Sequence, residues 1–351
     1  MEICPAGLLA EDMKFPRVSF RSSAGEARAG RDSRQLSRDF ASGRAVRIRR
    51  GVYVPTEAWL AGTAADRYAL TTASLAVQGP APVLCRETAL MAWGLEFRSV
   101  PSHVRYRTPR RSAVGSVPPA DLYGDPSSAA AAYARLRPGA RRLPQGFPDA
   151  RHFATSPGTQ KLLVPHLGLS LPVEPLDVAL TDTLHRLPFV DAVILSDALL
   201  AGRGELAVDR SREALVRLAD GLRSAAARRR LNAIVNFADG QSESVGESYS
   251  RALMHELGFE PPQLQVWIHA DGRRIARVDF YWPRLRLVGE FDGLTKYLGA
   301  RDAAQTVVAE KRREDAIRAT GERVVRWGWE DLVRPERFAA ILHRAGVPRM
   351  S

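Results

Sequence analysis

Two short apolar segments that carry acidic residues constrain this chain more than any other feature of its sequence. Positions 277–293 read RVDFYWPRLRLVGEFDG, and the apolar runs on either side of the proline predict two β-strands joined by a turn. Asp279 lies on the first strand, and Glu290 and Asp292 lie at the end of the second. Because side chains alternate along a strand, Glu290 and Asp292 point to one face and Phe291 points to the other.

Acidic side chains gathered on apolar strands repel one another and are costly to bury unless a cation or protons compensate them. A helix expected over 243–257 brings Glu247 within reach of the same face as Asp279 and Glu290. Mg²⁺ prefers carboxylate and carbonyl oxygens, keeps several waters and leaves room for a phosphate oxygen. The acidic group therefore predicts a Mg²⁺ (or Mn²⁺) site for phosphodiester chemistry. The alternative is an ordinary strand end, since E-x-D-G is also a common strand-to-turn sequence.

The last third of the chain predicts a mixed sheet flanked by helices. Hydrophobic periodicity and Gly or Pro breaks give the order α-β-β-β-α-β-α. The expected helices cover 243–257, 307–320 and 335–345, and the expected strands cover 264–269, 275–282, 285–291 and 323–327.

Several short motifs in this region resemble those of a nuclease family. They are GES at 246–248, VDF at 278–280 and GEFDG at 289–293, followed by Arg313, Ile317, Gly321 and VVRW from Val324. From residue 243 to about 347, the chain resembles the very-short-patch-repair-like endonucleases of the PD-(D/E)XK superfamily. The resemblance implies a restriction-endonuclease-like domain that cleaves DNA with a metal ion.

The resemblance also implies roles for individual residues. Asp279 and Glu290 would bind the metal ion, joined by the Phe291 carbonyl, and Glu247 would bind it directly or through water. Asp292 also belongs to the catalytic group that the resemblance implies. It occupies the position at which the PD-(D/E)XK motif has Lys.

Two lysines are candidates for the missing positive charge. Lys296 follows the acidic group closely, and Lys311 lies on the next expected helix. Either would orient the attacking water or stabilise charge on the phosphate. The alternative for each is a solvated surface lysine.

Charge and composition favour a nucleic-acid partner. The 351 residues carry a net charge of +12, and the pI is about 10.3, which is typical of proteins that bind polyanions. Only four of the 51 basic residues are Lys, so an arginine-rich composition also explains part of this charge. Two cysteines exclude a disulfide framework and a zinc cluster. With no secretory signal and no apolar run long enough for a membrane span, we expect a cytoplasmic protein with no membrane contact.

The N-terminal half begins with a pattern typical of a winged helix-turn-helix. A helix expected over 31–42 ends at Gly43, and RAVRIRRGVYV at 44–54 alternates basic and apolar residues around a Gly51 turn, which predicts a basic hairpin wing. The alternative is a structural wing that contacts protein. The residues expected to contact DNA are Arg34, Gln35 and Arg38 on the helix and Arg44, Arg47, Arg49 and Arg50 on the wing.

Positions 34–54 and 84–97 resemble the AbiEi-type antitoxin and transcriptional regulator family, and the likeness extends through helical segments to about residue 240. It implies DNA binding and a toxin partner encoded nearby. A helix is expected over 212–230 and a connector over 232–241. We therefore expect an α/β multi-domain chain made of an irregular leader (1–29), the winged helix-turn-helix (30–60), a mixed and then mainly helical middle domain (61–240) and the nuclease-like domain (241–351).

These patterns lead to two principal hypotheses of function. The first is a DNA-binding protein with a metal-dependent, endonuclease-like C-terminal domain that serves defence or DNA processing. The second is a non-catalytic, antitoxin-like transcriptional regulator with an inactive nuclease fold, which the absence of the motif's lysine favours. A weaker alternative is a scaffold whose middle helices bind a protein partner.

Overall fold

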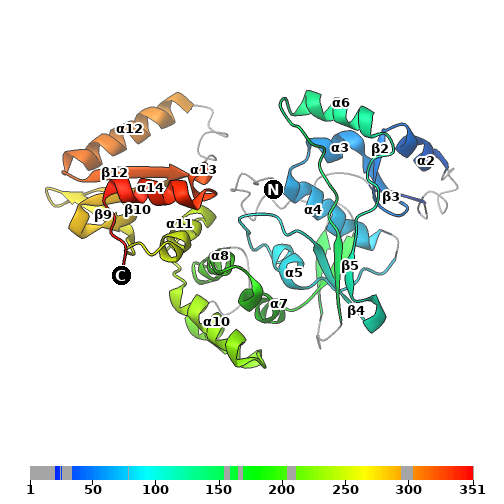
Figure 1. Cartoon of the computed structure of the whole chain (residues 1–351), viewed down its shortest axis with the longest axis horizontal. Coiled ribbons are helices and arrows are strands. Elements are labelled where there is room, and N and C mark those ends of the chain that lie inside the picture. The colour runs from blue at the N-terminus through cyan, green and yellow to red at the C-terminus, as the bar shows by residue number, and fades with distance from the viewer. Residues whose placement is uncertain are drawn as a thin grey trace. The chain divides into compact units, whose positions relative to one another are not determined.

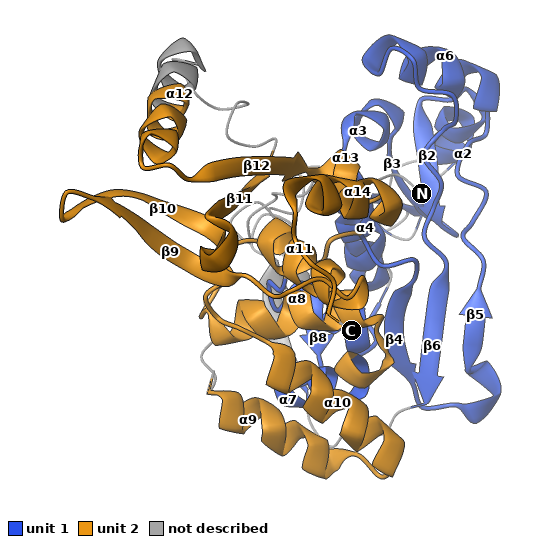
Figure 2. Cartoon of the chain, turned by 60° about the vertical axis from the view of Figure 1, so that its left-hand side comes forward, with its two compact units in different colours: residues 1–4, 9–95, 100–183 blue, residues 5–8, 96–99, 184–351 orange. Residues whose placement is uncertain are grey.

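Several small sheets and many helices make this chain a mixed α/β protein (Figure 1). The computed structural model describes residues 20–23, 25, 34–77, 79–153, 159–164, 169–203, 211–293 and 303–350. They fall into two compact units, which Figure 2 colours separately. Unit 1 contains the described residues up to Leu95 and from Val100 to Thr183, and unit 2 contains Glu96–Ser99 and those from Leu184 onward. Within these ranges, every helix is too short or too polar to cross a bilayer.

The basic segment at 44–54 forms the predicted β-hairpin in unit 1. Its alternate apolar side chains Val46, Ile48 and Val54 are buried in one core, as the alternation predicts. A two-residue strand pairs with this hairpin from within the expected irregular leader. The elements are β1 (Arg21–Ser22), α2 (Arg34–Ala41), β2 (Ala45–Arg49) and β3 (Val52–Pro55), and the strand order is β1-β3-β2.

The remainder of unit 1 combines short helices with two further groups of strands. Its helices up to residue 136 cover 56–61, 64–73, 86–92 and 126–136. Three strands form a sheet in the order β4-β6-β5, and β7 pairs with β8. The elements are α3 (Thr56–Ala61), α4 (Ala64–Ala73), α5 (Arg86–Ala92), β4 (Val104–Thr108), β5 (Gly115–Val117), α6 (Pro126–Leu136), β6 (Asp149–Phe153), β7 (Gln160–Val164), β8 (Leu169–Val173) and α7 (Leu176–Thr183).

The helices after residue 184 belong to the same unit as the C-terminal sheet, so the boundary predicted at residue 240 falls inside unit 2. A buried ion pair joins α8 (Phe189–Leu200) to α11 (Val245–Glu256): Arg251 donates to both carboxylate oxygens of Asp197 (2.7 and 2.8 Å). The helix expected over 212–230 is divided in two, and the expected connector is helical as far as Phe237 because Ile234 and Val235 are buried there. The elements are α8 (Phe189–Leu200), α9 (Arg212–Arg217) and α10 (Ala225–Phe237).

The last third has the predicted α-β-β-β-α-β-α order, with one short additional helix, α13, after the last strand. The sheet order is β12-β11-β10-β9, in which β11 and β12 are parallel and the other neighbours are antiparallel. The elements are α11 (Val245–Glu256), β9 (Gln263–Ala270), β10 (Arg273–Trp282), β11 (Leu287–Asp292), α12 (Ala303–Ala319), β12 (Arg323–Gly328), α13 (Trp329–Leu332) and α14 (Pro335–Ala345).

Alternation along β11 separates the charged side of this sheet from an aromatic side. Glu290 meets Arg313 of α12, whereas the Phe291 ring lies against Gly246 of α11, with its centroid 5.2 Å from that of Trp329. A Cβ on Gly246 would overlap the Phe291 ring. The glycine of the GES motif therefore allows α11 to approach β11 closely.

This close approach predicts that Gly246→Ala destabilises unit 2. The added methyl group must push α11 or the Phe291 ring aside, and overpacking of this kind costs about 1–3 kcal/mol. We expect that loss in the free energy of unfolding measured by urea titration. Combining Gly246→Ala with Phe291→Leu should recover part of it, and losses that simply add would contradict the proposed clash.

Candidate functional site

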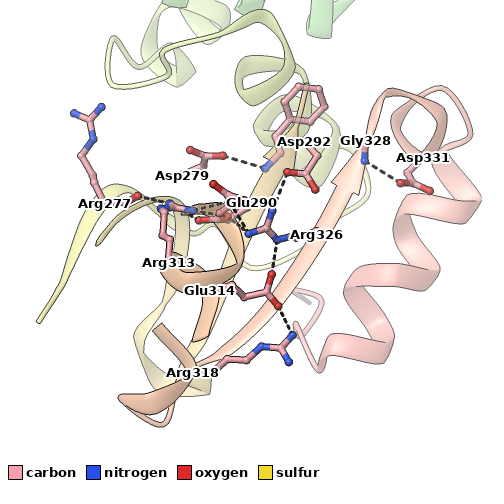
Figure 3. A network of polar contacts seen from close by, with 12 residues as sticks. Arg277, Asp279, Glu290, Asp292, Arg313, Glu314, Arg318, Arg326, Gly328 and Asp331 are labelled. Atoms are coloured by element: carbon pink, nitrogen blue, oxygen red, sulfur yellow. Dashed lines mark hydrogen bonds and ion pairs between the residues drawn. The ribbon is translucent and has the colours of Figure 1, made fainter. Parts of the chain in front are cut away.

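Asp279, Glu290 and Asp292 lie together where the C-terminal end of β11 runs beside β10 (Figure 3). The antiparallel register of β10 and β11 places Asp279 beside Glu290. The Asp279 carboxylate accepts a hydrogen bond from the Phe291 N–H (3.0 Å), which ties it to β11. The structure therefore brings together three of the four acidic residues that the sequence analysis selected.

Glu290 is buried (4% exposed) and is held by two arginines from different elements. Arg313 of α12 donates to both carboxylate oxygens (2.6 and 2.9 Å), and Arg326 of β12 lies 2.9 Å from one of them. Arg326 also donates to Asp292 (3.1 Å). Partial burial acts to lower the pKa of Arg326, but the hydrogen bond to Glu310 and the charges of Glu290 and Asp292 outweigh burial and raise the pKa. These contacts compensate the buried carboxylate without a metal ion.

A wider network of acidic and basic side chains surrounds Arg326 (Figure 3). Arg326 also contacts Glu310 (2.8 Å) and Glu314 (3.2 Å), and Arg318 pairs with Glu314. Five carboxylates and three guanidinium groups therefore share one network of contacts. Its members are Asp279, Glu290, Asp292, Glu310 and Glu314 with Arg313, Arg318 and Arg326.

Glu247, the fourth predicted acid, is held by local contacts at the start of α11. Its carboxylate accepts hydrogen bonds from the Ser244 hydroxyl (2.8 Å) and the Glu243 N–H (2.9 Å). It also accepts one from the Gln265 side chain (2.8 Å) on β9. Gln265 has a left-handed backbone (φ 53°), which is unusual for a non-glycine residue within a strand. Strained residues of this kind gather at functional sites. The register of β9 and β10 places Gln265 opposite Asp279, so Glu247 is hydrogen-bonded to the strand beside the one that carries Asp279.

The two candidate lysines have different outcomes. Lys296 lies outside the described residues. Lys311 is exposed on α12, and it is Arg313, two residues further along this helix, that reaches Glu290.

The donor chemistry of this site fits a divalent ion. Asp279 and Asp292 are half-buried carboxylates, the Phe291 carbonyl lies between Glu290 and Asp292 in sequence, and all are the oxygen donors that Mg²⁺ and Mn²⁺ prefer. As they stand, however, no three Asp, Glu, His or Cys side chains of the described ranges form a group that could hold a metal ion.

In unit 1, the seven residues predicted to contact DNA differ in their exposure and in the contacts that they make within the chain. Arg34 and Arg38 on α2 and Arg50 in the β2–β3 turn are exposed. Gln35 and Arg44 both donate to Asp39, which is 8% exposed. The hydrogen bond from Arg44 is the main reason that the pKa of Asp39 lies below its usual value.

The remaining two arginines of the wing are held by intramolecular contacts. Arg47 lies over the Phe40 ring (4.6 Å). Arg49 donates to both oxygens of the buried Asp149 (2.5 and 2.7 Å) and to the Ser74 hydroxyl (2.7 Å). The geometry therefore gives Arg49 a structural role, which differs from the predicted DNA contact.

Sequence reasoning gave no site role to Arg313, Arg326 or Gln265. The position of Arg326 could have been found from the sequence. Arg326 lies two residues after Val324 on β12, so both side chains point to the same face of the sheet, and parallel pairing of β12 with β11 places Arg326 beside Glu290. The left-handed conformation of Gln265 has no comparable signal, because the residue is neither glycine nor asparagine.

The Arg313–Glu290 contact predicts that Arg313→Gln destabilises unit 2. Removing this guanidinium leaves a buried carboxylate with reduced compensation, which costs about 3 kcal/mol. Urea denaturation followed by tryptophan fluorescence measures the loss. Arg312→Gln, at the exposed neighbouring position of α12, is the matched control and should change little. The double variant with Glu290→Gln should lose less than the two single losses combined, and strict additivity would refute the coupling.

Arg49 and Arg50 should respond differently to substitution by alanine. Arg49→Ala removes the main partner of the buried Asp149 and should lower the free energy of unfolding by about 3 kcal/mol. Arg50→Ala should leave stability within about 0.5 kcal/mol. If the wing contacts DNA, Arg50→Ala also reduces the dependence of affinity on salt by about one phosphate contact. An Arg49→Ala variant of unchanged stability would contradict the structural role.

No family model matches this chain. The chain is similar to two proteins from strains of Mycobacterium tuberculosis, MT2308 and Rv2248, both described as uncharacterized. Each is 34% identical over 112 residues, which is 32% of this chain and 40% of the relative. The chain therefore matches less than half the length of these relatives, and their names state no activity.

Proposed function

We propose that this chain acts on DNA and that unit 2 carries a phosphodiester-cleaving centre that requires Mg²⁺ or Mn²⁺. The observation that carries the proposal is the convergence of Asp279, Glu290 and Asp292 on the α12 side of the sheet, within one network of acidic and basic side chains. The net charge of +12 and the exposed arginines Arg34, Arg38 and Arg50 of unit 1 support DNA as the substrate.

Each residue of the site has a separate part in this proposal. Asp279 and Asp292 would hold the ion, with the Phe291 carbonyl beside them. A bound ion supplies positive charge for the phosphoryl oxygens and lowers the pKa of water. Glu290 holds Arg313 and Arg326 in place, and these guanidinium groups supply fixed positive charge beside the position of the phosphate. Glu247 orients Gln265, which lies opposite Asp279.

The proposal predicts nicking of supercoiled plasmid DNA in the presence of Mg²⁺ or Mn²⁺. Asp279→Asn and Asp292→Asn should each lower the nicking rate about 100-fold or more, because each removes a charged donor from the ion. Both changes preserve side-chain size, so the fold should persist, and circular dichroism checks this.

Asp315→Asn is the matched control for this assay, because Asp315 lies exposed on α12 outside the network. It should cleave at the wild-type rate. Absence of nicking with either ion, or equal rates in all the variants, would remove the nuclease proposal.

A second candidate function is a non-catalytic, antitoxin-like regulator, in which DNA binds but is not cut. The observation that favours it is the compensation of Glu290 by Arg313 and Arg326, since a buried carboxylate that is already paired does not need a metal ion. A toxin encoded nearby would then be the protein partner. Binding of the protein to its own promoter, unaffected by Asp279→Asn and without nicking, distinguishes this function from the first.

A further inference from the structure

The β9–β10 hairpin presents an exposed face that the acidic site does not use. We call this the ribbon face and define it by Trp267, His269, Arg274 and Arg277, all of which are exposed. Trp267 pairs with Arg277, and His269 pairs with Arg274, so these side chains share one side of the hairpin. The intervening residues Ile268, Ala276 and Val278 are buried.

The ribbon face continues directly into the candidate site. Asp279 lies two residues after Arg277 on β10, and alternation therefore directs both side chains to the same face. Arg313, which holds Glu290, also donates to the Arg277 backbone carbonyl (2.7 Å). A ligand that follows the hairpin along this face therefore arrives at Asp279.

Trp267 gives this face a flat aromatic surface. Its exposure is 41%, and it is the one aromatic among the large apolar side chains that the described residues expose. The Arg274 guanidinium lies over its ring (5.0 Å), an arrangement that combines a stacking surface with a positive charge. An exposed indole in a basic setting is a surface on which nucleic-acid bases stack.

We propose that the ribbon face binds an unpaired strand of DNA and guides it to the acidic site. Stacking on Trp267 requires a base whose face is open, which a paired base within a duplex does not offer. Arg274 supplies positive charge for the phosphates. With Arg273 beside it, the hairpin tip has two basic residues against the single acidic residue Asp271. This proposal deepens the proposed function, on which it rests for the choice of DNA as partner.

The test compares binding of the full chain to an oligothymidylate of about 20 nucleotides and to a duplex of the same length. Fluorescence anisotropy at fixed salt, with EDTA to prevent cleavage, measures both affinities. Trp267→Ala should weaken binding to the single strand about tenfold and leave duplex binding nearly unchanged. Trp267→Phe retains an aromatic ring and should recover most of the loss. Arg274→Ala should weaken binding to the single strand and reduce its salt dependence.

Val216→Ala is the matched control, because Val216 is a similarly exposed apolar residue (40%) on α9 of the same unit. It should bind both DNAs as the wild type does. An equal loss on single strand and duplex, or no loss for Trp267→Ala, would overturn the proposal. The binding assay contains no divalent ion, so its result can be interpreted even if the protein does not nick plasmid DNA. Conversely, a negative binding result does not decide whether the protein nicks plasmid DNA.

Discussion

Glu290 is a buried carboxylate on the central strand β11, and its charge is shared between guanidinium groups from two other elements. Burial of this carboxylate would cost several kcal/mol if it were unpaired. The contacts of Arg313 and Arg326 offset that cost, and in doing so they fix α12 and β12 relative to β11. The same contacts order the surrounding acids, because Arg326 also reaches Asp292 and Glu310. The arrangement of the candidate site is therefore a consequence of one buried charge.

The other side of the sheet makes this burial possible through close packing. Gly246 brings α11 against the Phe291 ring, and Gly289 leaves room for the rings of Trp327 and Trp282. Phe291 is thereby held on the aromatic side, and alternation along β11 then directs Glu290 and Asp292 toward α12. The glycines of the GES and GEFDG motifs act in packing, and the acids beside them act in the site. Packing on one face and charge on the other are coupled through the same short strand.

Much of this architecture follows from local sequence, because period-2 alternation and glycine or proline breaks are local signals. The strand pair with Asp279, Glu290 and Asp292 was predicted on these grounds, as was the basic hairpin of unit 1. The partners of these residues were not, because they are distant in sequence: Arg326 is 36 residues from Glu290, and Asp149 is 100 residues from Arg49. For the same reason the pattern did not show that Arg49 is bonded internally while Arg50, its neighbour, is exposed. Charged residues therefore need their tertiary partners before a role can be given to them.

The two arginines also bear on where a divalent ion would be held. A carboxylate offers about four acceptor positions, and three contacts from Arg313 and Arg326 already use the oxygens of Glu290. A divalent ion that took only the remaining position of Glu290 would leave the arginine contacts intact. An ion that took a second position would displace a guanidinium group from its partner. Asp279 and Asp292 are only half-buried, so their oxygens can be reordered at lower cost. The ligand set implied by resemblance is centred on Asp279 and Glu290, whereas the charges in this structure favour the two aspartates, with Glu290 acting mainly on the arginines.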